Sequence, residues 1–113
     1  MPNSSRRSSS SILVRARSIA ALAAVCAGAA HAAGHTVTMD GVKFEPATIT
    51  VAPGDTVTWI NKDPFPHTAT AAGVFDSREI APGKSWKWTA RKAGVYDYVC
   101  TLHPTMKGTI TVQ

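Results

Sequence analysis

The sequence predicts a small all-β domain, a sandwich or barrel, and three observations carry this prediction. Short runs alternate apolar with polar side chains and are rich in Val, Ile, Thr and aromatic residues. Turn signals such as Pro53-Gly54-Asp55 and Pro82-Gly83-Lys84 separate the runs at intervals of about 8–12 residues, as in small β-sandwiches. After residue 32, no stretch keeps a helical period with caps at its ends.

The predicted strands follow one another along the chain. Their expected ranges are 35–39, 47–51, 56–60, 67–71, 85–89, 95–99 and 109–112. The sequence leaves open a single turn of helix around residues 73–77. Because side chains alternate across a strand, Tyr96, Tyr98 and Cys100 are expected to share one face and to point inward. That placement would shield the thiol of Cys100 from bulk water.

The first 32 residues have the order of a secretory signal peptide. Residues 1–18 are rich in Ser and carry arginines without an acidic residue, residues 19–30 are small and apolar, and Ala30-His31-Ala32 offers a cleavage site. The apolar run is shorter than the roughly 20 residues of a transmembrane helix, so we expect cleavage after Ala32 and no membrane anchor afterwards. Arg6-Arg7 leaves a twin-arginine signal open, although the serines that follow favour the general export route.

Residues 33–113 are then expected to form one domain, near the lower end of the sizes that fold alone. The full chain has a net charge of +5, but four arginines belong to the leader, so the domain itself is close to neutral. No basic stripe with interleaved aromatic residues suggests nucleic acid. Cys26 is expected to leave with the leader, which makes Cys100 the single thiol of the domain. A lone thiol in an oxidising compartment is a liability unless it is bound, which favours this thiol as a metal ligand.

The segment Cys100-Thr101-Leu102-His103-Pro104-Thr105-Met106 places a thiolate, an imidazole and a thioether at three-residue intervals between two predicted strands. Thiolate, imidazole and a weak thioether together favour copper. A second imidazole has to come from elsewhere, and His67, which follows a proline-rich approach, is the best candidate. Taken singly, a buried cysteine or methionine is more often core filler. The combination favours a metal site, whereas His35, near the expected mature terminus, is left out of it.

These motifs resemble the cupredoxins, the type 1 blue copper proteins, and most of all the amicyanins, with plastocyanins and pseudoazurins as relatives. The matching segments are residues 53–61, Pro66-His67, residues 93–98 and the segment from Cys100 to Met106. The two-residue gaps on both sides of His103 are similar to those of amicyanins. The resemblance implies a Greek-key β-sandwich and one type 1 copper ion. It implies that the ligands are His67, Cys100, His103 and Met106.

Two residues depart from the family pattern. Thr68 stands where the family usually has an asparagine that ties two loops together. Leu102 stands between the cysteine and the second histidine, at a position where the family often has a proline. Unlike proline, leucine has a backbone N–H there. If that N–H reaches the Cys100 sulfur, it should raise the redox potential.

The predicted function is a periplasmic electron carrier that cycles copper between Cu(II) and Cu(I), and not an enzyme. Electrons are expected to pass through the exposed edge of His103 into a transient partner docked on an apolar patch that includes Phe65 and Leu102. The amicyanin resemblance fits a dehydrogenase as donor and a c-type cytochrome as acceptor. We expect a monomer.

A periplasmic copper-binding protein for delivery or resistance is the alternative. Such proteins often use clusters of methionine and histidine, and this chain has only Met39 and Met106 after the leader. A self-contained copper enzyme would need more histidines than the three left in the domain. A structural β-domain with an incidental thiol is the remaining rival.

Overall fold

The computed structural model describes residues 31–113, so the predicted signal peptide lies outside the described residues except for His31 and Ala32. The part described is built of β-strands. Their bounds are β1 (Gly34–Met39), β2 (Phe44–Glu45), β3 (Thr48–Val51), β4 (Thr56–Asn61), β5 (Thr70–Ala71), β6 (Phe75–Asp76), β7 (Ser85–Thr89), β8 (Gly94–Cys100) and β9 (His103–Val112).

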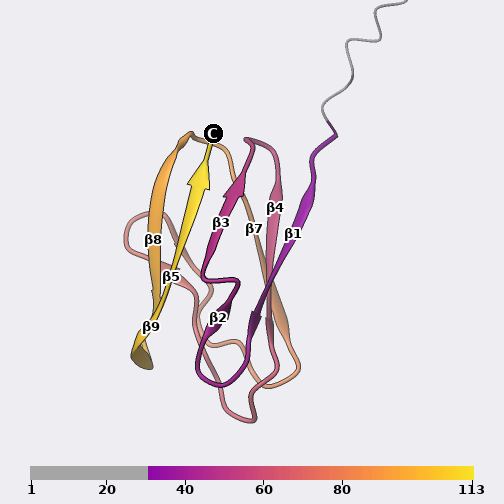
Figure 1. Ribbon diagram of the computed structural model, residues 1–113. Coiled ribbons are helices and arrows are strands. Elements are labelled where there is room, and N and C mark those ends of the chain that lie inside the picture. Colours follow the sequence, from indigo (N-terminus) through magenta and orange to yellow (C-terminus); the bar gives the residue numbers. More distant parts are fainter. Residues whose placement is uncertain (1–30) are drawn as a thin grey trace, which may run out of the picture.

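The strands form two sheets that face each other as a Greek-key β-sandwich, which confirms the predicted fold class (Figure 1). One sheet has the order β2-β1-β4-β7 and the other the order β3-β9-β8-β5-β6. Two neighbouring pairs are parallel, β1 with β4 and β3 with β9, and the others are antiparallel. The long pairing of β8 with β9 joins the two ends of the predicted metal-binding segment in one hairpin.

A cluster of aromatic rings fills the space between the sheets. Trp59 is fully buried, and its ring centroid lies 5.4 Å from those of both Phe75 and Tyr98 and 5.5 Å from that of Trp86. Trp59 and Tyr98 meet edge to face at 85°, a favourable arrangement for two rings. Such a close-packed interior deforms little, so the strand ends that emerge from it hold fixed positions.

Five predicted strands correspond within one residue to β1, β3, β4, β7 and β8. The predicted strand 67–71 is shortened to β5, and His67 instead pairs with Ile80 in an isolated bridge. The turn of helix that the sequence left open at 73–77 does not form, because the chain turns at residues 72–74 and continues as β6. That short strand pairs with β5, which satisfies backbone groups that a helical turn would leave unpaired.

The last strand begins at His103 and not near residue 109, as predicted. Cys100 and His103 are partners in the β8–β9 pairing, with a tight turn at Thr101 and Leu102 between them. Part of the predicted metal-binding loop is therefore the start of β9. A register shift between Val99 and Cys100 marks the end of the regular ladder.

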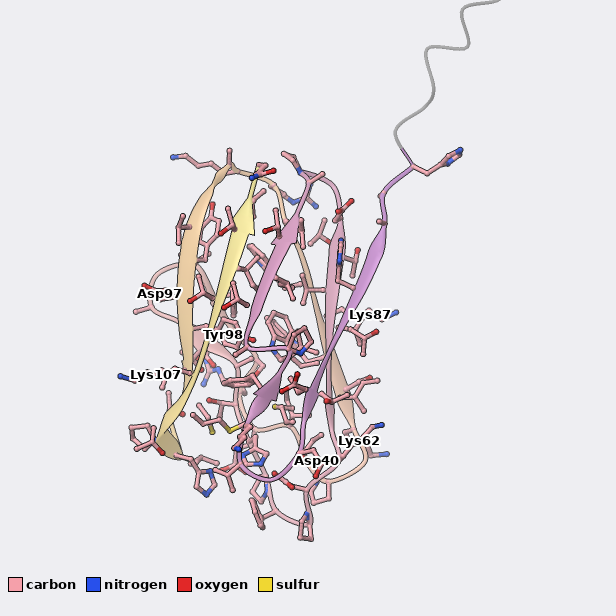
Figure 2. The ribbon with its side chains drawn as sticks, viewed as in Figure 1. Asp40, Lys62, Lys87, Asp97, Tyr98 and Lys107 are labelled. Carbon is pink, nitrogen blue, oxygen red and sulfur yellow. The ribbon has the colours of Figure 1, made fainter. Side chains whose placement is uncertain are left out.

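Three connections lie at one pole of the sandwich, the lower end in Figure 1: the β1–β2 turn, the β4–β5 loop and the β8–β9 turn. Figure 2 shows Asp40 and Lys62 beside this pole, whereas Asp97 and Lys107 project outward from the β8–β9 hairpin. Within residues 31–113 there is no helix of the length and apolar character needed to cross a membrane.

Candidate metal centre

Strand ends and one loop bring the four predicted ligands to this pole. Cys100 ends β8 and is fully buried, and Tyr98 on the same face is buried too, as strand parity predicted. His103 begins β9, and Met106 follows on the same strand with an exposed fraction of 2%. His67 comes from the β4–β5 loop. Its backbone N–H and C=O are both hydrogen-bonded to Ile80, at 3.2 and 2.7 Å, which fixes the loop where the imidazole leaves it.

The two imidazoles face one sulfur. Sγ of Cys100 lies 3.7 Å from Nδ1 of His67 and 3.7 Å from Nδ1 of His103. The ligand atoms of these three residues all lie within 4.8 Å of one another. Two nitrogens and one sulfur at such distances surround a point that one ion can occupy. Met106, buried on β9, supplies a thioether in the same sequence segment.

The chemistry of this donor set fits copper. A thiolate, two imidazoles and a thioether are soft or borderline donors, which copper prefers and which magnesium and calcium do not. Across the described part of the chain, the group of convergent His, Cys, Asp and Glu side chains contains His67, Cys100 and His103 and no carboxylate. These donor residues therefore suit the copper ion that the sequence predicted.

Thr68 supplies the cross-link for which the family uses asparagine. Its Oγ1 accepts a hydrogen bond from the backbone N–H of Thr101 at 2.9 Å and lies 3.1 Å from the Thr101 hydroxyl. Its backbone N–H donates to Sγ of Cys100 at 3.3 Å. One buried residue thus ties the β4–β5 loop to the β8–β9 turn and also contacts the sulfur. The sequence marked Thr68 only as a departure.

Asp63 was missed by sequence reasoning. Its carboxylate has an exposed fraction of 7%, and Oδ2 lies 2.7 Å from Nε2 of His67. Burial disfavours the ionised form, but the hydrogen bonds from Val42, His67 and Gly41 outweigh burial and lower the pKa of the Asp63 carboxyl below its ordinary value. Its position four residues before His67 was the available signal, and an Asp in a polar loop is too common to single out.

Comparisons with known proteins agree with the fold and the donor set. A family model described as a cupredoxin-like domain matches residues 13–112. The chain belongs to the cupredoxin family. It is 40% identical over 88 residues to a plastocyanin of Scenedesmus fuscus, covering 62% of this chain and 86% of that protein. It is 37% identical over 78 residues to an amicyanin of Paracoccus denitrificans, covering 64% of this chain and 60% of that protein.

Solved structures give the same family. A Cu(I) structure of an amicyanin mutant superposes with a TM-score of 0.68 at 34% identity, covering 71% of this cupredoxin and 82% of that chain. A copper-containing nitrite reductase from Thermus scotoductus superposes with a TM-score of 0.67 at 32% identity, but the match covers 22% of the reductase. The cofactor of this cupredoxin is copper, as one type 1 ion.

The second family departure behaves differently from the expectation. In residues 31–113, the N–H that reaches the Cys100 sulfur is that of Thr68, and no hydrogen bond from the Leu102 N–H to this sulfur is formed. The side chain of Leu102 is 44% exposed. Leu102 therefore contributes to the surface of this cupredoxin and not to the sulfur's hydrogen bonding.

His103 is the most exposed member of the group, as predicted. It is half-buried, whereas His67 and Cys100 are fully buried. The ring of Phe65, itself 36% exposed, lies 5.6 Å from that of His103 and 5.2 Å from that of His67. His35, which was left out of the site, pairs instead with Asp55, with Nε2 2.9 Å from Oδ2.

Proposed function

We propose that this cupredoxin is a periplasmic electron-transfer protein in which His67, Cys100, His103 and Met106 bind the copper ion. The convergence of two imidazole nitrogens on one buried thiol is the observation that carries the proposal. Copper bound in this way supplies one-electron chemistry between Cu(II) and Cu(I). No substrate is transformed, because the proposed role needs no acid, base or nucleophile.

The residues of the chain would keep the site dry and fixed. Cys100 and His67 have no exposed surface, so water does not reach their ligand atoms. The hydrogen bonds of Thr68 and the bridge to Ile80 hold the β4–β5 loop against the β8–β9 turn. A rigid donor set reorganises little when the charge of the bound ion changes, and this favours fast electron transfer.

The half-buried ring of His103 is the path by which electrons would leave the copper site for a partner protein. Exposed apolar residues flank it, with Phe65 at 5.6 Å and Leu102 next to it in the sequence. A small apolar surface suits the transient complexes of redox proteins. The amicyanin resemblance favours a dehydrogenase as electron donor and a c-type cytochrome as electron acceptor. We propose that this cupredoxin meets each of them as a monomer.

Adding cupric salt to the purified, reduced, copper-free protein tests the metal assignment. We expect one tightly held equivalent, an intense blue colour and a narrow hyperfine pattern in the EPR spectrum. Cys100→Ser should abolish the colour, whereas His35→Gln, which changes a histidine outside the site, should leave it intact. A colourless wild-type protein would contradict the proposal. Copper that exchanges readily with a chelator would favour delivery or resistance.

The rate of electron self-exchange between the Cu(I) and Cu(II) forms tests the docking surface without knowledge of the partner. Leu102→Lys places two like charges against each other when two copies meet through this surface, and we expect a slowing on the order of tenfold. Val95→Lys is the matched control, since Val95 is also an exposed apolar residue, at 68%, but is the second residue of β8, at the other pole. Equal slowing in both variants would sink the docking surface.

The export signal and the domain boundary belong to the same proposal. We place the signal at residues 1–32 and the copper-binding domain at 33–113. Mass spectrometry of the protein from a periplasmic fraction should give a chain that starts at Ala33. A chain that keeps residues 1–32 would contradict both the boundary and the location.

A further inference from the structure

The carboxylate of Asp63 lies between a copper ligand and a distant turn. Its Oδ2 contacts Nε2 of His67 at 2.7 Å. Its two oxygens also accept the backbone N–H groups of Gly41, at 2.7 Å, and of Val42, at 2.9 Å. The N–H of Asp63 itself donates to Oδ1 of Asn61 at 2.9 Å. These hydrogen bonds hold the buried carboxylate of Asp63 in a single position.

The conformation of the β1–β2 turn also helps to fix the carboxylate of Asp63. Gly41 and Val42 have φ values of 65° and 59°. This left-handed conformation is unfavourable for a β-branched residue such as Val, so the turn needs a compensating interaction. The Asp63 carboxylate provides it by accepting both N–H groups. The turn therefore fixes the carboxylate without help from His67.

We propose that Asp63 is a positioning residue for the ligand His67 and that it lowers the redox potential of the copper site. Accepting the proton of Nε2 leaves the lone pair of Nδ1 directed at the Cys100 sulfur, 3.7 Å away. A carboxylate behind the imidazole makes the ligand more basic, which favours Cu(II) over Cu(I). In the part of the chain described, Nε2 of His103 has no such partner, so the two histidines differ. This inference rests on the proposed ligand set.

Replacing Asp63 by Asn tests the proposal. The copper-loaded variant should have a higher midpoint potential, because removing the charge weakens Cu(II) binding more than Cu(I) binding. A tenfold differential loss corresponds to about 59 mV. Asp55→Asn is the matched control, because Asp55 is also buried and accepts two backbone N–H groups and one histidine nitrogen, but at the other pole. It should leave the potential unchanged.

Measurements on the wild-type protein cover the case in which Asp63→Asn does not fold. In the diamagnetic Cu(I) form, nitrogen NMR should show His67 protonated at Nε2 with a strongly hydrogen-bonded proton. An unchanged potential in Asp63→Asn, an equal shift in Asp55→Asn, or an Nε2 proton of His67 without the signature of a strong hydrogen bond would each overturn the role of Asp63. Failure of the wild-type protein to turn blue would instead overturn the proposed function.

A second observation concerns the other pole. The backbone nitrogen of Ala33 lies 2.9 Å from Oδ1 of Asp55, while the other oxygen contacts His35 and the N–H of Ala52, each at 2.9 Å. The carbonyl of Ala33 accepts the N–H of Thr56 at 3.0 Å, which fixes Ala33 in place. We infer that Asp55 is the binding site for the amino terminus created by cleavage after Ala32. The new ammonium group would stand where the precursor has a neutral amide, and a hydrogen bond whose donor and acceptor are both charged is stronger.

Two purified chains test this second inference, one that starts at Ala33 and one with Gly-Ser added before it. The chain that starts at Ala33 should unfold at a higher temperature at pH 7, and Asp55→Asn should remove the difference. Equal unfolding temperatures in the wild-type pair, or a difference that persists in Asp55→Asn, would overturn it. Failure of the proposed cleavage is a separate result, because the mass of the exported protein reports it.

Discussion

Side chains that are not ligands determine how the donor atoms of the site are held. Thr68 contacts the Cys100 sulfur through its N–H and the β8–β9 turn through its hydroxyl. Asp63 holds the far side of His67. Each of these groups is buried, so each would leave an unpaired polar partner if it were removed. The ligand geometry therefore depends on hydrogen bonds as well as on packing.

Thr68→Val should destabilise the fold while keeping the shape of the side chain. The variant removes the acceptor of the Thr101 N–H, and the loss of one part-buried hydrogen bond costs about 0.5–1.5 kcal/mol. Chemical denaturation of the copper-free protein measures the free energy of unfolding. Thr70→Val is the control, because its hydroxyl contacts Thr68 and Asp76 but not the turn. Equal stability of Thr68→Val and wild type would show that the cross-link is not needed.

The β8–β9 hairpin is the element that carries three of the four proposed ligands. β9 pairs with β8 along its length, from His103 to Val112, and its last residues, 109–112, also pair with β3. Tyr98 and Gly108 are partners in the hairpin. The Tyr98 ring lies across Gly108, where a Cβ atom would come within 2.3 Å of Cζ. The hairpin thus needs a glycine for steric reasons.

Gly108→Ala should therefore destabilise the protein by about 1–3 kcal/mol, the range typical of overpacking a core. The clash involves a buried ring that packs on Trp59, so the ring has little room to move away. Gly34→Ala in β1 is the control, because a Cβ there meets nothing within 4 Å. Thermal unfolding of both variants measures the effect. A Gly108→Ala protein as stable as wild type would contradict the close approach of Tyr98.

At the scale of the whole molecule, the sequence predicted the parts of the fold that have a strong local pattern. Strands with clear alternation, such as β4 and β7, were found within one residue. The strands β2 and β6 have two residues each and show no period. The start of β9 was missed because Pro104 favours a loop reading, while pairing with β8 decides the conformation.

The candidate site also has parts that the sequence predicted and parts that it did not. Its four proposed ligands could be recognised from chemical type and spacing in the sequence. The contacts of Asp63 with Gly41 and Val42 could not, because they join segments that are 22 and 21 residues apart. Such contacts follow from the sandwich, which places the β1–β2 turn beside the β4–β5 loop. Long-range hydrogen bonds therefore need the structure.

Acid should weaken the pole of the sandwich opposite the metal centre. Hydrogen bonds from the Ala52 N–H, from His35 and from the Ala33 N–H lower the pKa of Asp55 from 3.8 to about 2. Because the folded-state pKa lies below the unfolded one, the carboxylate stabilises the fold above about pH 4, and this contribution is lost as the pH falls towards 2. The stability gap between wild type and Asp55→Asn should therefore shrink from pH 5 to pH 2 in denaturation curves of the copper-free protein. Asp40→Asn, a change at an exposed position, should show no such gap. A gap for Asp55→Asn that stays constant over this range would contradict the role of the ionised carboxylate.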